Sequence, residues 1–196
     1  MKNQPVTSLT YYLTEACNLR CTYCYVDKQP KHSSFEVGKA TLEFLFRESR
    51  RETSLHLRFF GGEPMLEIGL IEKLVEYGRS RAAEIGKTIR FDMISNATLA
   101  TPEVVLRLQS LGVDVITSVD GSRKTMEENR PFFVVRENFD GFEGKLRHLI
   151  STGVGKVARM TISPGQTDIV GNLEHLLALG YESIMMTTAR PRSQSM

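Results

Sequence analysis

Three cysteines lie close together near the amino terminus, and they are the only cysteines in the sequence. Cys17, Cys21 and Cys24 are spaced C-x3-C-x2-C. Three cysteines cannot all pair in disulfides, and such tight clustering is not expected of incidental core residues. Thiolates on one short loop can point at a single centre, and soft thiolate ligands select zinc, copper(I) or iron–sulfur clusters. The spacing therefore predicts a thiolate metal centre.

The number of cysteines separates the possible centres. Structural zinc usually takes four protein ligands in two pairs, and the sequence has no second cysteine pair. His32 is a candidate fourth ligand, but it stands alone. A [4Fe–4S] cluster held by three cysteines leaves one iron without a protein ligand, and that iron is open to a second molecule. A zinc or redox site, and three incidental buried cysteines, are the alternatives.

The elements that must position these cysteines follow an alternating pattern. Short apolar, β-rich runs alternate with segments of helical period, which is typical of a parallel α/β sheet. We expect strands at residues 8–13, 55–60, 89–95, 113–119, 156–162 and 182–187. We expect helices at residues 36–52, 68–86, 102–111, 139–149 and 168–179. Residues 122–137 are expected to form a loop without regular helix, because Arg130-Pro131 disfavours helical backbone.

Six βα units are too few to close an eight-stranded barrel, which typically needs about 250 residues. The pattern leaves an open, curved part-barrel or a doubly wound sheet. In both, ligands gather at the carboxyl ends of the strands. The cysteines lie at such an end, and so do three further motifs: Gly61-Gly62-Glu63-Pro64, Ser95-Asn96-Ala97-Thr98 and Ser118-Val119-Asp120-Gly121.

These strand-end residues have groups suited to binding a ligand. Gly61 and Gly62 permit positive φ and a close approach of the backbone, and the Glu63 carboxylate can accept from an ammonium group. Arg159 lies within a strand, where a charge is costly unless it is paired. A structural ion pair is one way to satisfy that charge. The motifs are also compatible with ordinary turns and helix caps.

The order of these motifs resembles that of the radical S-adenosylmethionine (SAM) enzymes, whose signature is C-x3-C-x-aromatic-C with Tyr23 at the aromatic position. The resemblance implies an α/β fold, a partial (β/α)6 TIM-like barrel of parallel strands, formed by residues 1–196 as one core domain. It implies that Cys17, Cys21 and Cys24 bind a [4Fe–4S] cluster whose open iron is chelated by SAM. The reduced cluster would cleave SAM to methionine and a 5′-deoxyadenosyl radical, which abstracts hydrogen from the substrate.

The resemblance also implies contacts to SAM. The Gly-Gly-Glu-Pro motif would receive the methionine amino group, and Asn96 would offer an amide, although Ala97 replaces the glycine common in relatives. Ser118 would bind the SAM carboxylate, and Arg159 would reach the carboxylate or the ribose. The sequence does not name a catalytic acid or base, since hydrogen abstraction by a radical needs neither in its first step. The implied cofactor-binding residues are Tyr23, Gly61, Gly62, Glu63, Pro64, Asn96, Ser118 and Arg159.

The cysteine stretch and Ser118-Val119-Asp120-Gly121 are most similar to the branch that modifies peptides or proteins, such as sulfatase maturases and ribosomal-peptide maturases. A peptide or protein substrate and an electron donor of the flavodoxin or ferredoxin type are therefore expected. Those relatives usually add a domain with auxiliary clusters, and no cysteine follows Cys24, so the chain is either a fragment or works with one cluster. A small-molecule radical SAM enzyme and a non-catalytic iron–sulfur or zinc module are the competing hypotheses.

Composition limits the remaining classes. The 25 basic and 23 acidic residues give a net charge of +2, too balanced for a nucleic-acid arm or a polybasic membrane patch. No apolar run approaches the roughly 18 residues that span a bilayer. The amino terminus also lacks the apolar core of a signal peptide. We expect a cytoplasmic protein that binds neither nucleic acid nor membrane.

Overall fold

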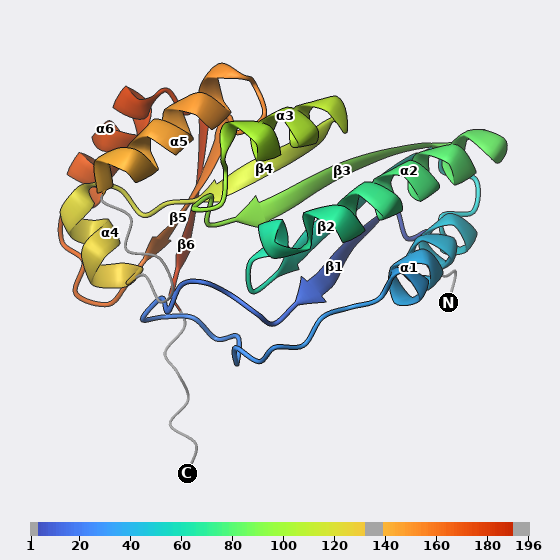
Figure 1. The fold of residues 1–196 in the computed structure, drawn as a ribbon, viewed down its shortest axis with the longest axis horizontal. Helices are drawn as coiled ribbons and strands as arrows, with labels where there is room; N and C mark the ends of the chain where they lie inside the picture. Colours follow the sequence, from blue (N-terminus) through green and yellow to red (C-terminus); the bar gives the residue numbers. More distant parts are fainter. Residues whose placement is uncertain (1–3, 132–138, 190–196) are drawn as a thin grey trace, which may run out of the picture.

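The computed structural model describes residues 4–131 and 139–189. The described residues form one parallel sheet of six strands in the order β1-β2-β3-β4-β5-β6, so each strand pairs with the next one in sequence (Figure 1). The strands are β1 Ser8–Thr14, β2 Ser54–Gly61, β3 Thr88–Ser95, β4 Val113–Ser118, β5 Val157–Ile162 and β6 Ser183–Thr188. The helices are α1 Phe35–Glu48, η1 Pro64–Glu67, α2 Ile68–Glu84, α3 Pro102–Ser110, α4 Arg123–Asn129, α5 Phe139–Ser151 and α6 Ile169–Leu179.

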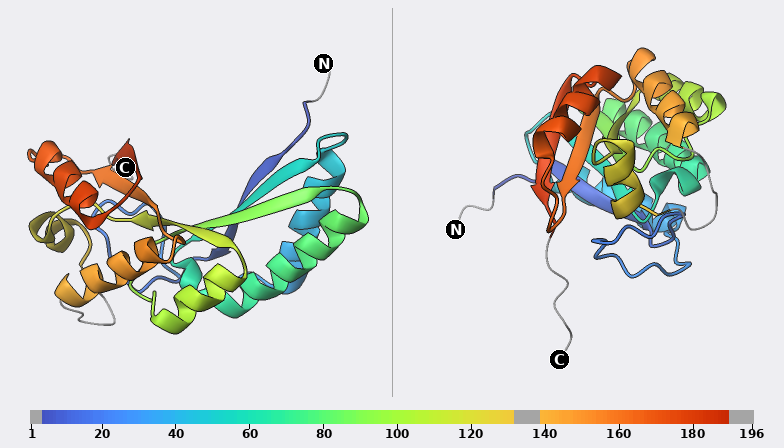
Figure 2. Two further views of the ribbon diagram at one scale, coloured as in Figure 1. Left: turned by 90° about the horizontal axis from the view of Figure 1, so that it is seen from above. Right: turned by 90° about the vertical axis from the view of Figure 1, so that its left-hand side faces the viewer.

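The sheet bends into an open arc when it is seen from above, with α1, α2, α3 and α5 on its convex side (Figure 2). This arrangement confirms the prediction of an α/β part-barrel with parallel strands. In the described residues β1 and β6 pair on one side only, so the arc is not closed. All six predicted strands are present within a residue or two of their expected limits.

The strands alternate between two environments, because successive side chains of a strand point to opposite faces of the sheet. In β2, Leu55, Leu57 and Phe59 are buried in the core under the helices. The intervening side chains, Arg58 and Phe60 among them, line the concave side, which is partly open. The convex side therefore carries the core, and the concave side remains available for a site.

The predicted loop at 122–137 is wrong for residues 123–129, which form α4. Pro131 does exclude helical backbone just before it, since Arg130 has φ −128°. That restriction reaches only one residue back, so the seven residues upstream can form two turns of helix. Residues 132–138, the rest of the predicted loop, lie outside the described residues.

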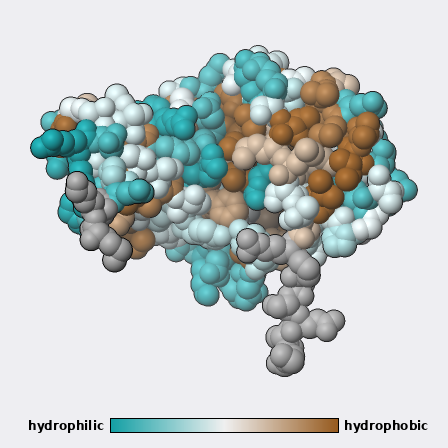
Figure 3. All heavy atoms as spheres, turned by 180° about the vertical axis from the view of Figure 1, so that it is seen from behind, coloured by the Kyte–Doolittle hydropathy of each residue, from teal (hydrophilic) through white to brown (hydrophobic). Residues whose placement is uncertain are grey.

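The face opposite to that of Figure 1 is apolar in part. Figure 3 shows hydrophobic side chains gathered over its right-hand half, the half in which β5 and β6 lie. Met185 and Met186 on β6 are 44% and 56% exposed. In the part of the chain that the structure describes, no helix is long and apolar enough to cross a bilayer.

Candidate functional site

The cysteines lie on a loop between β1 and α1 that leaves the sheet and returns to the same point. Thr14 at the end of β1 forms an antiparallel bridge with His32. Ser33 N–H donates to Leu13 C=O at 2.7 Å, and Glu15 N–H donates to Lys31 C=O at 2.9 Å. These bonds close the neck of the loop, so the cysteines are presented at the carboxyl edge of the sheet.

All three cysteines keep their thiols outside disulfide bonds and are partly exposed. Leu19 N–H lies 3.4 Å from Cys17 Sγ, and Asn96 Nδ2 lies 3.8 Å from the same sulfur. Burial raises the pKa of Cys17 to about 11 and also raises the pKa of Cys21. Thiols must lose their protons to ligate a metal, so metal binding here is coupled to proton release.

The arrangement of donors bears on which centre the loop can hold. The described residues contain no set of three His, Cys, Asp or Glu side chains arranged to hold one metal ion. His32, the candidate fourth zinc ligand, faces away to Glu67, whose Oε1 lies 2.5 Å from its Nδ1. A four-iron cluster places one thiolate on each of three irons and so needs no convergence on a single ion. The donor set fits a three-cysteine cluster better than structural zinc.

The Gly-Gly-Glu-Pro motif fastens the cysteine loop to the end of β2. Gly62 N–H donates to Thr14 C=O at 2.7 Å, and Glu63 N–H donates to Ala16 C=O at 2.9 Å. A Cβ on Gly61 would lie 2.2 Å from Thr14 O, and one on Gly62 would lie 2.0 Å from Ala16 O. The close approach that the glycines permit is therefore an approach to the chain's own cysteine loop.

Glu63 is fully buried and turned into the protein. Its Oε1 accepts from Ser95 Oγ at 2.6 Å and Met65 N at 2.9 Å, and its Oε2 accepts from Asn96 N at 2.8 Å. Burial raises the pKa of this carboxyl, and the three donors oppose that shift. Pro64 is buried at the start of η1. The carboxylate thus joins the ends of β2 and β3.

The turn after β3 contacts the cysteine loop through amide groups. Asn96 Nδ2 donates to Asn18 Oδ1 at 3.0 Å, and Asn18 Nδ2 donates to Thr98 Oγ1 at 2.7 Å. Between them Ala97 is fully buried and has φ +59°, the left-handed conformation that favours glycine. The alanine that departs from the common pattern therefore keeps the backbone that a glycine would adopt.

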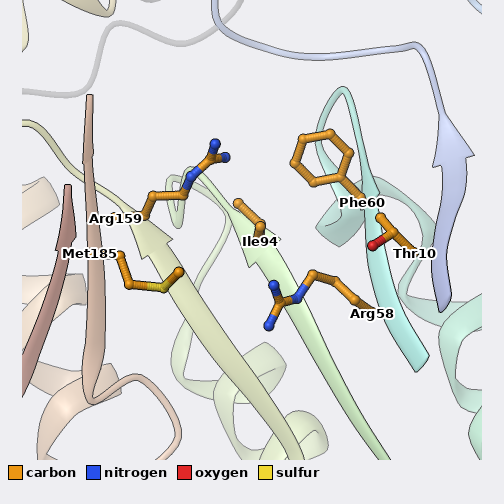
Figure 4. A pocket seen from close by; sticks show the side chains of 6 residues that line it. All are labelled: Thr10, Arg58, Phe60, Ile94, Arg159 and Met185. Atoms are coloured by element: carbon orange, nitrogen blue, oxygen red, sulfur yellow. The ribbon is translucent and has the colours of Figure 1, made fainter. Parts of the chain in front are cut away.

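Ser118 at the end of β4 and Arg159 within β5 lie side by side, because they are register partners. Arg159 forms no ion pair or side-chain hydrogen bond with any residue in the described ranges, so the structural alternative for it is not supported there. Its side chain points into a cavity of about 260 Å³ on the concave side (Figure 4). The cavity is lined by Thr10, Arg58, Phe60, Ile94, Arg159 and Met185.

The sequence did not predict a buried ion pair that contacts the cysteine loop through Tyr23. Asp120 is 0% exposed and Arg130 is 5% exposed. Arg130 donates to both oxygens of Asp120 at 2.8 Å, and Tyr23 OH donates to Asp120 Oδ2 at 2.6 Å. The sequence signals are Asp120 in a strand-end motif and Arg130 directly before a proline, but neither indicates the pairing.

A match to a known family agrees with this geometry. The family model described as "Radical SAM superfamily" matches residues 11–179. An uncharacterized protein of Methanocaldococcus jannaschii is 28% identical over 192 residues, covering 93% of this chain and 62% of that protein. A GTP 3′,8-cyclase of Synechococcus sp. is 32% identical over 121 residues, covering 59% of this chain and 33% of the cyclase.

The fold also matches solved structures. Native anSMEcpe with bound AdoMet (SAM) and Cp18Cys peptide superposes with a TM-score of 0.81 at 20% identity. The match covers 94% of this chain and 51% of that chain, and at this identity it shows the fold alone. This chain spans less than two thirds of the length of each of these three proteins.

Proposed function

Because the chain belongs to the radical SAM superfamily, we propose that it cleaves SAM reductively to a 5′-deoxyadenosyl radical, which abstracts hydrogen from a substrate. Members of this superfamily use a [4Fe–4S] cluster and SAM as cofactors. The observation that carries the proposal is the cysteine loop, which is hydrogen-bonded to the carboxyl end of β2 in a sheet whose concave side holds a cavity lined by Arg159. We propose that residues 1–196 act as one core domain.

Cys17, Cys21 and Cys24 would hold the cluster. Three thiols outside disulfide bonds, on a loop that is closed at its neck, fit a centre that takes three thiolates. When bound, the reduced cluster supplies the electron that cleaves SAM. The amide of Asn96, 3.8 Å from Cys17 Sγ, would remain beside the ligating sulfur, where hydrogen bonds tune a cluster.

The remaining site residues would orient SAM. Ser118 and Arg159 share one register position, so both can reach the same carboxylate, and among the described residues no side chain pairs with the Arg159 guanidinium. We propose that the backbone of Gly61, Gly62 and Pro64 receives the methionine amino group. Glu63 would fix that backbone from behind, because its carboxylate already accepts three hydrogen bonds.

One apolar wall of the open concave side would shield the reacting atoms from water. Phe60, Ile94 and Met185 form an apolar wall of the cavity that Arg159 enters (Figure 4). An apolar wall excludes water and strengthens the electrostatic contacts within the site. This arrangement supports radical chemistry, in which side reactions with solvent must be prevented.

Anaerobic reconstitution tests the proposal. We expect about four iron and four sulfide per chain, and 5′-deoxyadenosine that forms only when dithionite and SAM are both present. The variant with Cys17, Cys21 and Cys24 all changed to Ala should lose both properties. Iron-free protein that binds one zinc ion tightly would overturn the proposal and support a zinc module.

We propose a peptide or protein side chain as the substrate and a flavodoxin- or ferredoxin-type protein as the electron donor. The fold of a protein solved with a bound peptide supports a substrate of this class, and so does the open side of the sheet. The match to a GTP 3′,8-cyclase favours a small molecule as the second candidate. Isotope-labelled peptides and GTP, each incubated with the loaded protein, would separate them by which one transfers label to 5′-deoxyadenosine.

We also propose a cytoplasmic location. Three partly exposed thiols outside disulfide bonds need a reducing compartment if they are to remain available as ligands. Fractionation of cells that express the natural protein would test this, since cytoplasmic enrichment is expected and enrichment outside the cytoplasm would contradict it.

A further inference from the structure

Asp120 is at the centre of a buried group that joins four separate segments. Its two oxygens accept four hydrogen bonds, which is the full capacity of a carboxylate. Arg130 supplies two at 2.8 Å, Tyr23 OH supplies one at 2.6 Å, and Thr161 N–H supplies one at 2.9 Å. The donors come from the cysteine loop, from β5 and from the residue that ends α4.

The same region contacts the cysteine loop through backbone atoms. Thr22 N–H donates to Asn129 C=O at 2.9 Å, and Arg20 N–H donates to Pro131 C=O at 3.0 Å. The Arg130 guanidinium also lies 5.4 Å from the centre of the Tyr23 ring, within the range of a cation–π contact. The stretch that includes Cys21 is therefore held on both sides by the end of α4.

The charges within this group are matched. Burial alone would lower the pKa of Arg130, but Asp120 and Tyr23 raise it, so the guanidinium stays charged. Burial raises the pKa of Tyr23 well above its ordinary value, so its hydroxyl remains a donor. A buried ion pair adds little net stability when it is compared with apolar residues, but it specifies one geometry.

We propose that Asp120 and Arg130 are positioning residues, which hold Tyr23 and the turn from Cys21 to Cys24 at a fixed place over the ends of β4 and β5. Ser118 ends β4 and its register partner Arg159 lies within β5, so the buried ion pair sets the place of the cluster relative to the SAM carboxylate. The second part rests on the proposed function, whereas the first concerns the protein without any cofactor.

The test uses variants that keep the fold. Tyr23→Phe removes only the hydroxyl that reaches Asp120, and Arg130→Lys keeps the charge but loses the paired donors. Tyr25→Phe is the matched control, because Tyr25 follows Cys24 and is 70% exposed. Its hydroxyl lies 3.2 Å from that of Tyr12, its single hydrogen-bond partner among the described residues. Amide hydrogen exchange of residues 17–25 is measured in the protein without cofactors.

We expect exchange in this segment to be about tenfold faster in Tyr23→Phe and Arg130→Lys, since each loses a hydrogen bond to a charged group. Tyr25→Phe should stay within about twofold of the wild type, because an exposed hydrogen bond contributes little. Wild-type exchange in Tyr23→Phe would overturn the proposal, whatever the outcome of reconstitution.

The second readout uses protein loaded with the cluster. In Tyr23→Phe the iron content should equal that of the wild type, while the SAM dissociation constant rises about tenfold and the change that SAM causes in the cluster's electron paramagnetic resonance spectrum is altered. A wild-type spectrum and wild-type SAM affinity in this variant would remove the link to SAM. Failure of the wild type to load any cluster would instead count against the proposed function.

Discussion

Ala97 has a strained backbone conformation and lies in the turn after β3 that contacts the cysteine loop. It is fully buried with φ +59°, and a left-handed conformation costs a non-glycine residue roughly 1–2 kcal/mol. We expect Ala97→Gly to keep the wild-type free energy of unfolding within about 0.5 kcal/mol, because relief of strain offsets the lost methyl group and the added chain entropy.

Ala100→Gly is the control for this prediction, since Ala100 is 1% exposed and does not have a positive φ. It loses the same methyl group without any relief of strain and should be destabilised by about 1–2 kcal/mol. Urea denaturation of both variants measures the difference. Equal losses at the two positions would show that Ala97 carries no strain.

Arg159 allows its two alternatives to be separated by stability. If Arg159 formed a structural ion pair, its replacement would destabilise the folded protein. If it binds a ligand instead, its replacement removes no contact within the protein and leaves the stability unchanged. We expect Arg159→Met to unfold within about 0.5 kcal/mol of the wild type and to bind SAM at least about tenfold more weakly, as measured by equilibrium dialysis of the loaded protein.

Arg58→Met is the matched variant for Arg159→Met. Arg58 lines the same cavity but donates to both oxygens of Asp92 at 2.7 and 2.6 Å. Its removal leaves a partly buried carboxylate without these donors and should cost about 1–2 kcal/mol of stability. If Arg159→Met proves the less stable of the two, the ion-pair interpretation of Arg159 is the correct one.

At the scale of elements, β2 can meet the cysteine loop closely because Gly62 has no side chain. Gly62→Ala would bring a Cβ to 2.0 Å from Ala16 O, which is backbone and cannot move without shifting the loop. We expect a loss of about 1–3 kcal/mol or more and reduced iron uptake on reconstitution. Thermal unfolding and iron analysis measure both effects.

Gly69→Ala makes the same chemical change where there is space. Gly69 lies in the first turn of α2, and a Cβ there would meet nothing within 4 Å. We expect this variant to gain about 0.5–1 kcal/mol from the lower chain entropy of its unfolded state and to load iron normally. Normal loading of Gly62→Ala as well would mean that this junction does not position the cysteines.

The pair of β3 and β4 carries a like-charge contact on the concave side. Asp92 and Asp114 are register partners, and burial together with Asp92 raises the pKa of Asp114, with Arg90 opposing the shift. The native state therefore holds this proton to higher pH than the unfolded state, so ionisation of Asp114 destabilises the protein as pH rises above the unfolded pKa of about 4.

Asp114→Asn should consequently be more stable than the wild type at pH 7 by about 0.5 kcal/mol, a small value because the residue is largely exposed. The advantage should vanish near pH 3, where the carboxyl is protonated in both states. Chemical denaturation at the two pH values measures it. An equal advantage at both would point to packing rather than charge.

The outcome for the elements shows what a single sequence can predict. Apolar periodicity located the six strands, because each must bury one face under helices. It missed α4, whose seven residues are too few to display a period before a proline. The sequence also does not reveal the orientation of Glu63 or the pairing of Asp120 with Arg130. Such contacts join residues from different segments of the chain and depend on how the strand ends meet.

At the scale of the whole molecule, cofactor binding and folding stability are linked. A group that binds only the folded chain stabilises it, and each kcal/mol raises the melting temperature of a chain of this length by roughly 2–4 °C. We expect cluster loading to raise the melting temperature of the wild type by at least about 5 °C. The triple Cys→Ala variant should show no shift under the same treatment, and an equal shift in both would indicate binding elsewhere.

The hydrogen bond from Tyr23 to Asp120 joins residues 97 positions apart, so during synthesis Tyr23 is made well before its partner. A ribosome makes the cysteine loop early, but the Asp120 group, which holds the stretch around Tyr23, is complete only once β4, α4 and β5 have been synthesised. At about 5–20 residues per second, that takes on the order of ten seconds. For this interval the three thiols are carried by an unfinished chain, so their need for reducing surroundings is greatest during translation.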